Sequence, residues 1–277
     1  MFANNYYTLV AGFREYALDG ETKGFDIEEI LLDVEEALSA SDWRAVELLY
    51  TYYDCENLVG LRNGTTAYNR LGRIAREALA EELHNPSLLA KELATVVRAY
   101  AQPDGEEAED VATERPFAVS LFEAYYAKCS RSSSRLLRQW SEAERTLRNV
   151  VAAISARERG VAVENVVVGT GDTVDALRRS SAADFGLRGE LQWIDTLITT
   201  LSDERNIVEK ERKIDLIRWS IVDELSEQDY FSLNAVIAYL IKANIVARWA
   251  QLDRKVGAEM FERLMADLNG KEMINKL

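Results

Sequence analysis

The sequence predicts a mainly α-helical protein built as a multi-helix bundle, and three observations support this fold class. Apolar residues recur at helical spacing along most of the chain. The 277 residues include only three prolines and fourteen glycines, which favours helices over a turn-rich β-sandwich. Hydrophobic residues make up 48% of the chain and charged residues 29%, which is typical of a globular protein with a sizeable core.

The first part of the chain, residues 1–102, is expected to form an N-terminal helical lobe. Its apolar spacing predicts four helices, over Asp26–Leu38, over Ser41–Tyr53 with Ser41 as the N-cap, over Thr66–Leu83, and from Asn85-Pro86 to a point before Gln102. The following stretch, residues 103–116, is polar, acidic and bounded by prolines. We expect a mobile loop or a boundary between lobes there.

The middle segment, residues 117–187, is dominated by one long helical pattern over Phe117–Arg159, with a possible break around Ser132–Ser134. Residues Leu136, Trp140, Ala143, Leu147, Val150 and Ile154 repeat at alternating spacings of four and three, as in a coiled-coil seam. Gly160 is expected to end the helix. Residues 161–168 then form an apolar run similar to Tyr6–Phe13, and the two runs are candidate partners for a small β ribbon.

The last part, residues 188–277, is expected to form a C-terminal helical lobe that packs with the rest in one compact unit. Helices are predicted over Arg188–Leu201, Glu204–Leu225, Ser232–Asp253 and, shorter and amphipathic, Ala258–Leu268. The third of these is apolar almost all round, which is typical of a helix in the middle of a bundle.

The net charge of −14 makes nucleic acid an unexpected partner, because a duplex-binding module must neutralise phosphates. The single histidine, His84, excludes a multi-histidine zinc site. Cys55 and Cys129 are interpreted as reduced, buried thiols.

No signal peptide or membrane span is recognised, so we expect a cytoplasmic protein. The glycines of Val166–Thr173 lack the rest of a phosphate-loop motif, and an ordinary turn is the favoured interpretation.

One candidate site lies in the predicted helix over Glu204–Leu225. Glu211, Asp215 and Arg218 share one stripe of that helix, beside its apolar face. Lys242 and Arg248 of the next helix are their expected partners in an interhelical ion-pair network. The alternative is an acid/base or metal site built on the two carboxylates. We favour the structural network, and we predict no catalytic residue, metal or cofactor.

A second candidate is a basic stripe along the middle segment, formed by Lys128, Arg131, Arg135, Arg138 and Arg145. In an acidic protein such a stripe has two interpretations. It is either a solvated face paired with the chain's own acidic helices, which we favour, or a docking surface for an acidic partner helix.

The segment Val236–Met265 resembles the C-terminal signature of a family of central-stalk proteins in the V/A-type rotary ATPases. These are the C-type subunits, which correspond to the d-type subunits of eukaryotic V-ATPases. In that family an apolar helix with an aromatic-Leu pair and a lysine is followed by a polar continuation, a glycine and a short amphipathic helix. The matching positions here are Tyr239, Leu240, Lys242, Arg248 and Gly257.

The whole chain resembles an uncharacterised bacterial family whose genes lie among those of V-type ATPases. The motifs that carry this resemblance are Asn5–Gly12, Ala183–Leu187, Ile214–Trp219 and Ala247–Asp253, in that order along the chain. The resemblance implies a funnel-like helical protein of three pseudo-equivalent lobes, peripheral on the cytoplasmic membrane face.

Its implied role is a noncatalytic rotor adapter that links the axle of the ATPase to the membrane proteolipid ring, and so supports ion transport, including proton transport. We expect no small-molecule substrate, no nucleic acid and no direct membrane span. The alternatives are a helical enzyme that uses the Glu211 and Asp215 carboxylates, with or without a divalent metal, and a general helical interaction scaffold.

Overall fold

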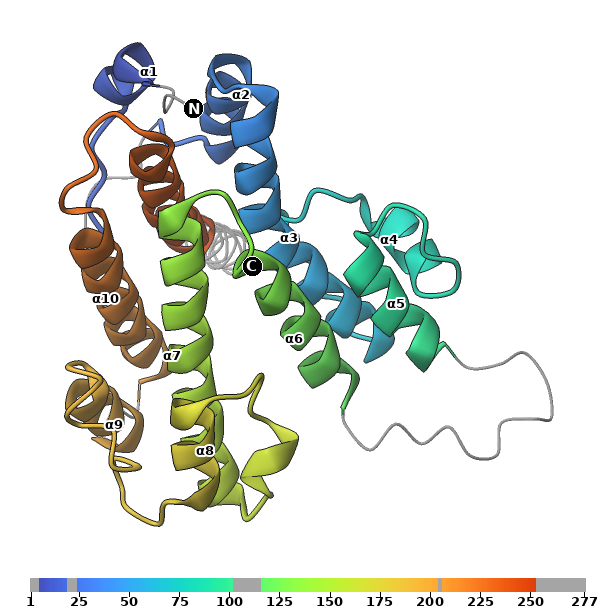
Figure 1. Ribbon diagram of the computed structural model, residues 1–277, viewed down its shortest axis with the longest axis vertical. Coiled ribbons are helices and arrows are strands. Elements are labelled where there is room, and N and C mark those ends of the chain that lie inside the picture. Colours follow the sequence, from blue (N-terminus) through green and yellow to red (C-terminus); the bar gives the residue numbers. More distant parts are fainter. Residues whose placement is uncertain (1–4, 19–23, 102–115, 204–205, 253–277) are drawn as a thin grey trace, which may run out of the picture.

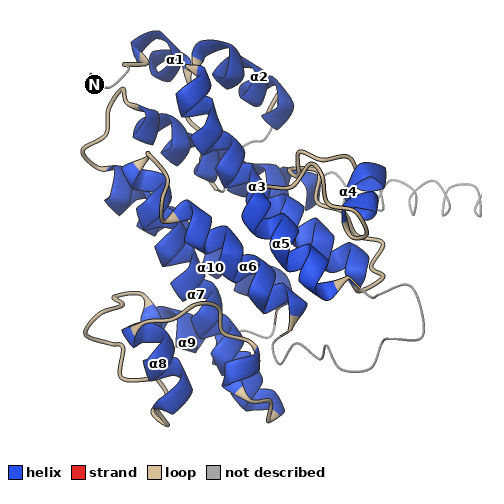
Figure 2. Cartoon of the chain, turned by 45° about the vertical axis from the view of Figure 1, so that its right-hand side comes forward, coloured by secondary structure: helices blue, strands red, loops and turns tan. Residues whose placement is uncertain are grey.

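The computed structural model describes residues 5–18, 24–101, 116–203 and 206–252. Every regular element in these ranges is a helix, and none is a strand (Figures 1 and 2). The predicted all-α fold is therefore confirmed. Within the described ranges, none of the helices combines the length and the apolar composition that a membrane span requires.

The longest described helix, α7 (Arg135–Arg159), runs through the centre of the molecule (Figure 1). It begins at Ser134, whose hydroxyl accepts a hydrogen bond from the Leu137 amide, and ends at Gly160 in the left-handed conformation. The preceding helix, α6 (Phe117–Cys129), is a separate element. The predicted break around Ser132–Ser134 is thus confirmed, and the long pattern divides into two helices.

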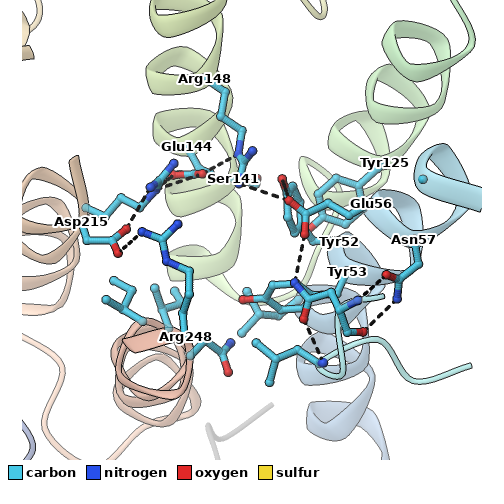
Figure 3. A pocket seen from close by; sticks show the side chains of 18 of the residues that line it. Tyr52, Tyr53, Glu56, Asn57, Tyr125, Ser141, Glu144, Arg148, Asp215 and Arg248 are labelled. Carbon is cyan, nitrogen blue, oxygen red and sulfur yellow. Dashed lines mark hydrogen bonds and ion pairs between the residues drawn. The ribbon is translucent and has the colours of Figure 1, made fainter. Parts of the chain in front are cut away.

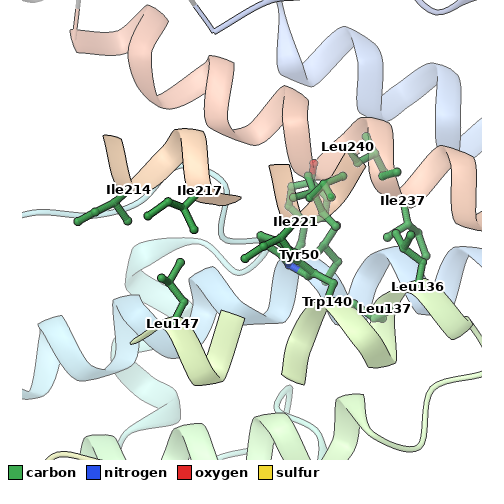
Figure 4. Close-up of a cluster of buried hydrophobic side chains, with 14 of the residues drawn as sticks. Tyr50, Leu136, Leu137, Trp140, Leu147, Ile214, Ile217, Ile221, Ile237 and Leu240 are labelled. Atoms are coloured by element: carbon green, nitrogen blue, oxygen red, sulfur yellow. The ribbon is translucent and has the colours of Figure 1, made fainter. Parts of the chain in front are cut away.

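Two further helices pack beside α7 and carry much of the core. They are α10 (Ile207–Ser226) and the helix over residues 233–252. Figure 4 shows the side chains that meet between them and α7 and α3; the labelled ones are Tyr50, Leu136, Leu137, Trp140, Leu147, Ile214, Ile217, Ile221, Ile237 and Leu240. Burial of these apolar surfaces is the main force that holds the bundle together.

Short helices cover the two ends of α7 (Figure 1). At one end lie α1 (Tyr7–Gly12) and α2 (Ile27–Ala37), and at the other lie α8 (Asp172–Arg179) and α9 (Ile194–Asp203). The main apolar cluster draws residues from Tyr6 through to Ile241. The predicted N-terminal, middle and C-terminal segments all contribute to this one core.

A second apolar cluster lies to the side of α7, among α3 (Ala40–Arg62), α4 (Arg76–Glu82), α5 (Lys91–Tyr100) and α6. In Figure 1 these helices extend toward the right-hand edge of the molecule. Both cysteines, Cys55 and Cys129, are buried in this cluster as free thiols.

The predicted β ribbon is wrong. Residues 7–12 form α1, and residues 163–165 form the short 3-10 helix η1 (Val163–Asn165). The Asn149 side chain explains why the second of these apolar runs forms no strand. Its Oδ1 accepts from the Val168 amide at 2.8 Å and its Nδ2 donates to the Val168 carbonyl at 2.8 Å, so a side chain of α7 satisfies the backbone groups that a strand partner would bind.

Several helix boundaries also differ from expectation. The structure begins α5 at Lys91 instead of Asn85-Pro86, and it begins α9 at Ile194 instead of Arg188. The N-cap of α3 is Ser39, not Ser41, and the helix continues well past Tyr53 to Arg62. The predicted helix over Thr66–Leu83 is helical only from Arg76 to Glu82. Its first half forms turns, because side chains of α3 bind its backbone.

Two buried polar residues of α3 hold these turns. Asn57 accepts from the Asn69 amide at 2.7 Å and donates to the Asn69 carbonyl at 2.9 Å. Asp54 accepts from the amides of Arg73 and Ile74 at 2.9 and 3.1 Å. These contacts replace the intrahelical hydrogen bonds that a longer α4 would make.

Some expectations fall outside the described residues. These are the acidic loop up to residue 115, the amphipathic segment Ala258–Leu268, and Gly257 of the signature that resembles the rotary ATPase family. Pro116, the last residue of the predicted loop, is the N-cap of α6.

Candidate functional site

A buried polar cluster is centred on Asp215 of α10, which is only 2% exposed. Its Oδ1 accepts from Arg218 Nη1 at 2.9 Å, and its Oδ2 accepts from the indole Nε1 of Trp249 at 2.8 Å. Arg248 Nη2 also donates to Oδ2. Both carboxylate oxygens are therefore engaged by groups from α10 and from the helix over 233–252, and the buried charge is paired.

A second buried carboxylate, Glu144 of α7, extends this arrangement. It accepts from Arg148 Nε at 2.6 Å and from Arg218 Nε at 2.9 and 3.2 Å. Burial alone would raise the pKa of Glu144, but Arg218 and Arg148 outweigh it, so that the pKa lies below its ordinary value. Glu144 is therefore charged at neutral pH.

The outer members lie closer to solvent. Arg248 Nη1 donates to Glu211 Oε2 at 3.0 Å, and Arg148 Nη2 lies 3.8 Å from Oε1 of Glu56 in α3. We call the complete set the arginine–carboxylate network; its members are Glu56, Glu144, Arg148, Glu211, Asp215, Arg218 and Arg248. It connects α3, α7, α10 and the helix over 233–252 (Figure 3).

A pocket of about 480 Å³ lies beside this network. Figure 3 shows Tyr52, Tyr53, Glu56 and Tyr125 on one side of it and Glu144, Asp215 and Arg248 on the other. Tyr52 donates its hydroxyl hydrogen to Glu56 at 2.8 Å. Burial raises the pKa of the Tyr52 and Tyr53 hydroxyls well above the ordinary value, so both stay protonated at neutral pH.

Of the predicted site residues, the structure brings Glu211, Asp215, Arg218 and Arg248 together, but it places Lys242 elsewhere. Lys242 pairs with Asp223, and its ammonium lies 5.0 Å from the centre of the Trp219 ring. Lys242 and Arg248 are six positions apart, which is about 240° around a helix, so they point in different directions.

The carboxylate pair has no arrangement for metal binding. Glu211 and Asp215 both bind the Arg248 guanidinium, which occupies the position between them that a cation would take. Among the described residues, no group of three or more His, Cys, Asp or Glu side chains is placed to hold a metal ion.

The predicted basic stripe is divided between two helices and makes contacts within the chain. Lys128 of α6 and Arg131 of the following turn both pair with Glu92 at 3.3 Å. The three members on α7 bind other groups: Arg135 binds Asp229, Arg138 donates to the carbonyls of Ser132 and Ser133, and Arg145 binds Glu142.

Sequence reasoning missed Glu144 and Arg148. The signal was present, because the two residues stand four positions apart on α7, the spacing of a helical ion pair. Glu144 also follows Ala143 of the predicted apolar seam, so burial of its side chain could have been suspected. The contact of Glu144 with Arg218 of α10 and that of Arg148 with Glu56 of α3 depend on tertiary packing, which periodicity does not report.

Together, the fold and the site define an all-α bundle whose helices are joined internally by arginines and carboxylates. Residues 3–272 match the family described as "Protein of unknown function (DUF2764)", and the chain belongs to this family. No curated protein and no solved structure matches the chain.

Proposed function

We propose that this protein is a noncatalytic adapter in the central stalk of a V/A-type ATPase. In this role it sits on the cytoplasmic face of the membrane and links the axle to the proteolipid ring. It thereby supports ion transport coupled to ATP hydrolysis or synthesis. The funnel-like arrangement of three lobes that the resemblance implies is part of this proposal.

The observation that carries the proposal is the position of Asp215. Two of the motifs that resemble the ATPase-associated family are Ile214–Trp219 and Ala247–Asp253. Asp215 belongs to the first and accepts hydrogen bonds from Arg248 and Trp249 of the second. Residues that resemble that family in sequence therefore act together in one buried contact between helices.

The mechanical properties of this contact suit an adapter. A part that transmits torque must keep its helices from sliding past one another under load. Hydrogen bonds to charged groups contribute about 1.5–3 kcal/mol each and depend on direction. The network places several of them between α7, α10 and the helix over 233–252, where they oppose such sliding.

The geometry gives less support to the alternatives. The Glu211 and Asp215 carboxylates of the enzyme hypothesis are bound to Arg248. The basic stripe of the scaffold hypothesis is bound to the chain's own groups. No contact in the described residues favours either of them over the adapter.

The test is an affinity purification of the tagged protein from detergent-solubilised membranes of its own cells, with the accompanying chains identified by mass spectrometry. We expect axle and ring proteins of the rotary ATPase to be recovered. The tag alone is the control. Recovery of neither, under conditions in which the ATPase remains assembled, would overturn the proposal.

A further inference from the structure

The pocket beside the arginine–carboxylate network is not used by the adapter role, and it has the features of a small-molecule site. Its volume of about 480 Å³ falls within the range of such sites. Its described charged lining residues are three arginines and three carboxylates, namely Arg148, Arg218, Arg248, Glu56, Glu144 and Asp215. These groups pair with one another, so the pocket offers a ligand no excess of either charge. This balance favours an uncharged ligand.

One wall of the pocket is aromatic (Figure 3). The ring centroids of Tyr52 and Tyr53 of α3 lie 5.4 Å apart, and those of Tyr52 and Tyr125 of α6 lie 5.8 Å apart, in both cases edge to face. The helix over 233–252 contributes Ile241 and Ile245 to the lining. Aromatic and aliphatic side chains of this kind can pack against a flat ring.

Three hydrogen-bond donors of the lining have no partner within the described ranges. They are the Tyr53 hydroxyl, the indole Nε1 of Trp140 and the Nδ2 of Asn244. The Oδ1 of Asn244 accepts from the Tyr50 hydroxyl at 2.7 Å, which leaves the amide nitrogen to donate elsewhere. Trp140 is 8% exposed and Asn244 is 5% exposed, so both side chains are otherwise buried.

These three donors are open to solvent. The Tyr126 hydroxyl also lacks a partner among the described residues, but it is sealed in the interior, whereas the three donor atoms are not. Burial raises the pKa of the Tyr53 hydroxyl, which therefore keeps its hydrogen at neutral pH. A ligand with acceptors at these points replaces water without loss of hydrogen bonds. A ligand without acceptors displaces the water and leaves the donors unsatisfied.

We propose that this pocket binds an uncharged, planar heteroaromatic molecule whose ring carbonyls or ring nitrogens accept hydrogen bonds. The ring packs against the aromatic wall, and its acceptors bind the Tyr53 hydroxyl, the Trp140 Nε1 and the Asn244 Nδ2. This inference is independent of the adapter role, since it depends only on the pocket and its open donors. Either proposal can fail without the other.

The test is calorimetric titration of the full chain with caffeine, coumarin and N-methylquinolone. Each of these probes is flat and uncharged, and each accepts hydrogen bonds but donates none. The comparison compounds are indole, which is flat but only donates, and naphthoate, which is flat but negatively charged. We expect saturable binding of at least one of the three probes, with a rise in Tm. Its affinity should exceed that of both comparison compounds about tenfold or more.

Two variants and a matched control make the test specific. Tyr53→Phe removes only the open hydroxyl and should weaken binding of the best probe about threefold to tenfold. Asn244→Asp keeps an acceptor for Tyr50 but replaces the amide donor by a carboxylate oxygen, so it should weaken binding further. Tyr126→Phe is the control, because Tyr126 lines the same pocket but its hydroxyl is sealed off. It should bind the probe like the wild type.

Three results would overturn the proposal. The first is the absence of saturable binding of all three probes to the wild-type chain. The second is binding of indole or naphthoate as tight as that of the best probe. The third is equal affinity of the wild type and Tyr53→Phe. This last comparison decides the question even if Asn244→Asp fails to fold, because Tyr53→Phe removes no hydrogen bond to the described residues.

Discussion

Arg218 of α10 donates its Nε–H to both carboxylate oxygens of Glu144 of α7, at 2.9 and 3.2 Å. The two side chains are 13% and 9% exposed, so the contact is largely shielded from water. Arg218 also donates to Asp215. A single guanidinium therefore compensates two buried carboxylates and joins the two halves of the network.

Replacement of Arg218 by methionine should destabilise the protein by about 3–5 kcal/mol, because it leaves two buried carboxylates with fewer compensating groups. Urea unfolding at pH 7 measures this loss. The control is Arg188→Met, which removes an exposed ion pair with Asp195 and should leave the unfolding midpoint unchanged. Equal unfolding midpoints for the two variants would contradict the role assigned to Arg218.

Much of the fold follows from helical periodicity. The seam residues Leu136, Trp140, Leu147 and Val150 are all buried, as their spacing predicts, because a long amphipathic helix can bury only its apolar stripe. Helical periodicity gives no such test for the β ribbon. A short apolar run has the same composition in a strand, a turn or a helix, and here the distant Asn149 side chain determines the backbone at Val168.

Part of the candidate site could also be predicted from the sequence, and part could not. Residues on one stripe of one helix share a face, so the association of Asp215 with Arg218 follows from spacing. The choice of Arg248 over Lys242 as partner depends on how the next helix is rotated, and the contribution of Glu144 depends on how α7 lies against α10. Both are properties of tertiary packing.

Asn149 should be essential for the loop after η1. Its replacement by alanine removes two hydrogen bonds and leaves the Val168 amide and carbonyl without these partners, which should cost about 2–4 kcal/mol. Thermal unfolding measures the loss. Asn149→Asp keeps the acceptor for the amide but places a carboxylate against the carbonyl, so it should also be destabilised. A variant Asn149→Ala as stable as the wild type would show that the loop is held by other contacts.

Asp54 should make stability depend on pH. Burial raises its pKa from 3.8 to about 6, although the amides of Ile74 and Arg73 oppose the shift. Below about pH 3 the group is protonated in both folded and unfolded chains. As pH rises from about 3 to 6, the unfolded chain loses this proton first. The contribution of Asp54 to the free energy of unfolding therefore becomes destabilising, and it reaches about 3 kcal/mol above about pH 7.

Asp54→Asn tests this directly, because the amide oxygen can still accept from Arg73 and Ile74. The variant should be more stable than the wild type at pH 8, and the difference should vanish near pH 3. Urea unfolding of both proteins at several pH values gives the comparison. A constant difference from pH 3 to 8 would contradict the raised pKa.

Gly72 should tolerate no side chain. A Cβ there would lie 2.6 Å from Asn57 Nδ2 and 2.9 Å from Asp54 Oδ1. Gly72→Ala should therefore cost about 1–3 kcal/mol through overpacking, measured by thermal unfolding. Gly189→Ala is the matched control, since nothing lies within 4 Å of a Cβ at Gly189. If both variants melt at the same temperature, the turns held by Asp54 and Asn57 can move aside.

The adapter role is tested most directly on the intact ATPase. The complex should be purified from native membranes through a tag on an axle protein, and its composition determined by native mass spectrometry. We predict a 31.3 kDa chain with this sequence, at fixed stoichiometry, in particles that contain both the axle and the ring. Particles that contain axle and ring but lack this chain would contradict the adapter role.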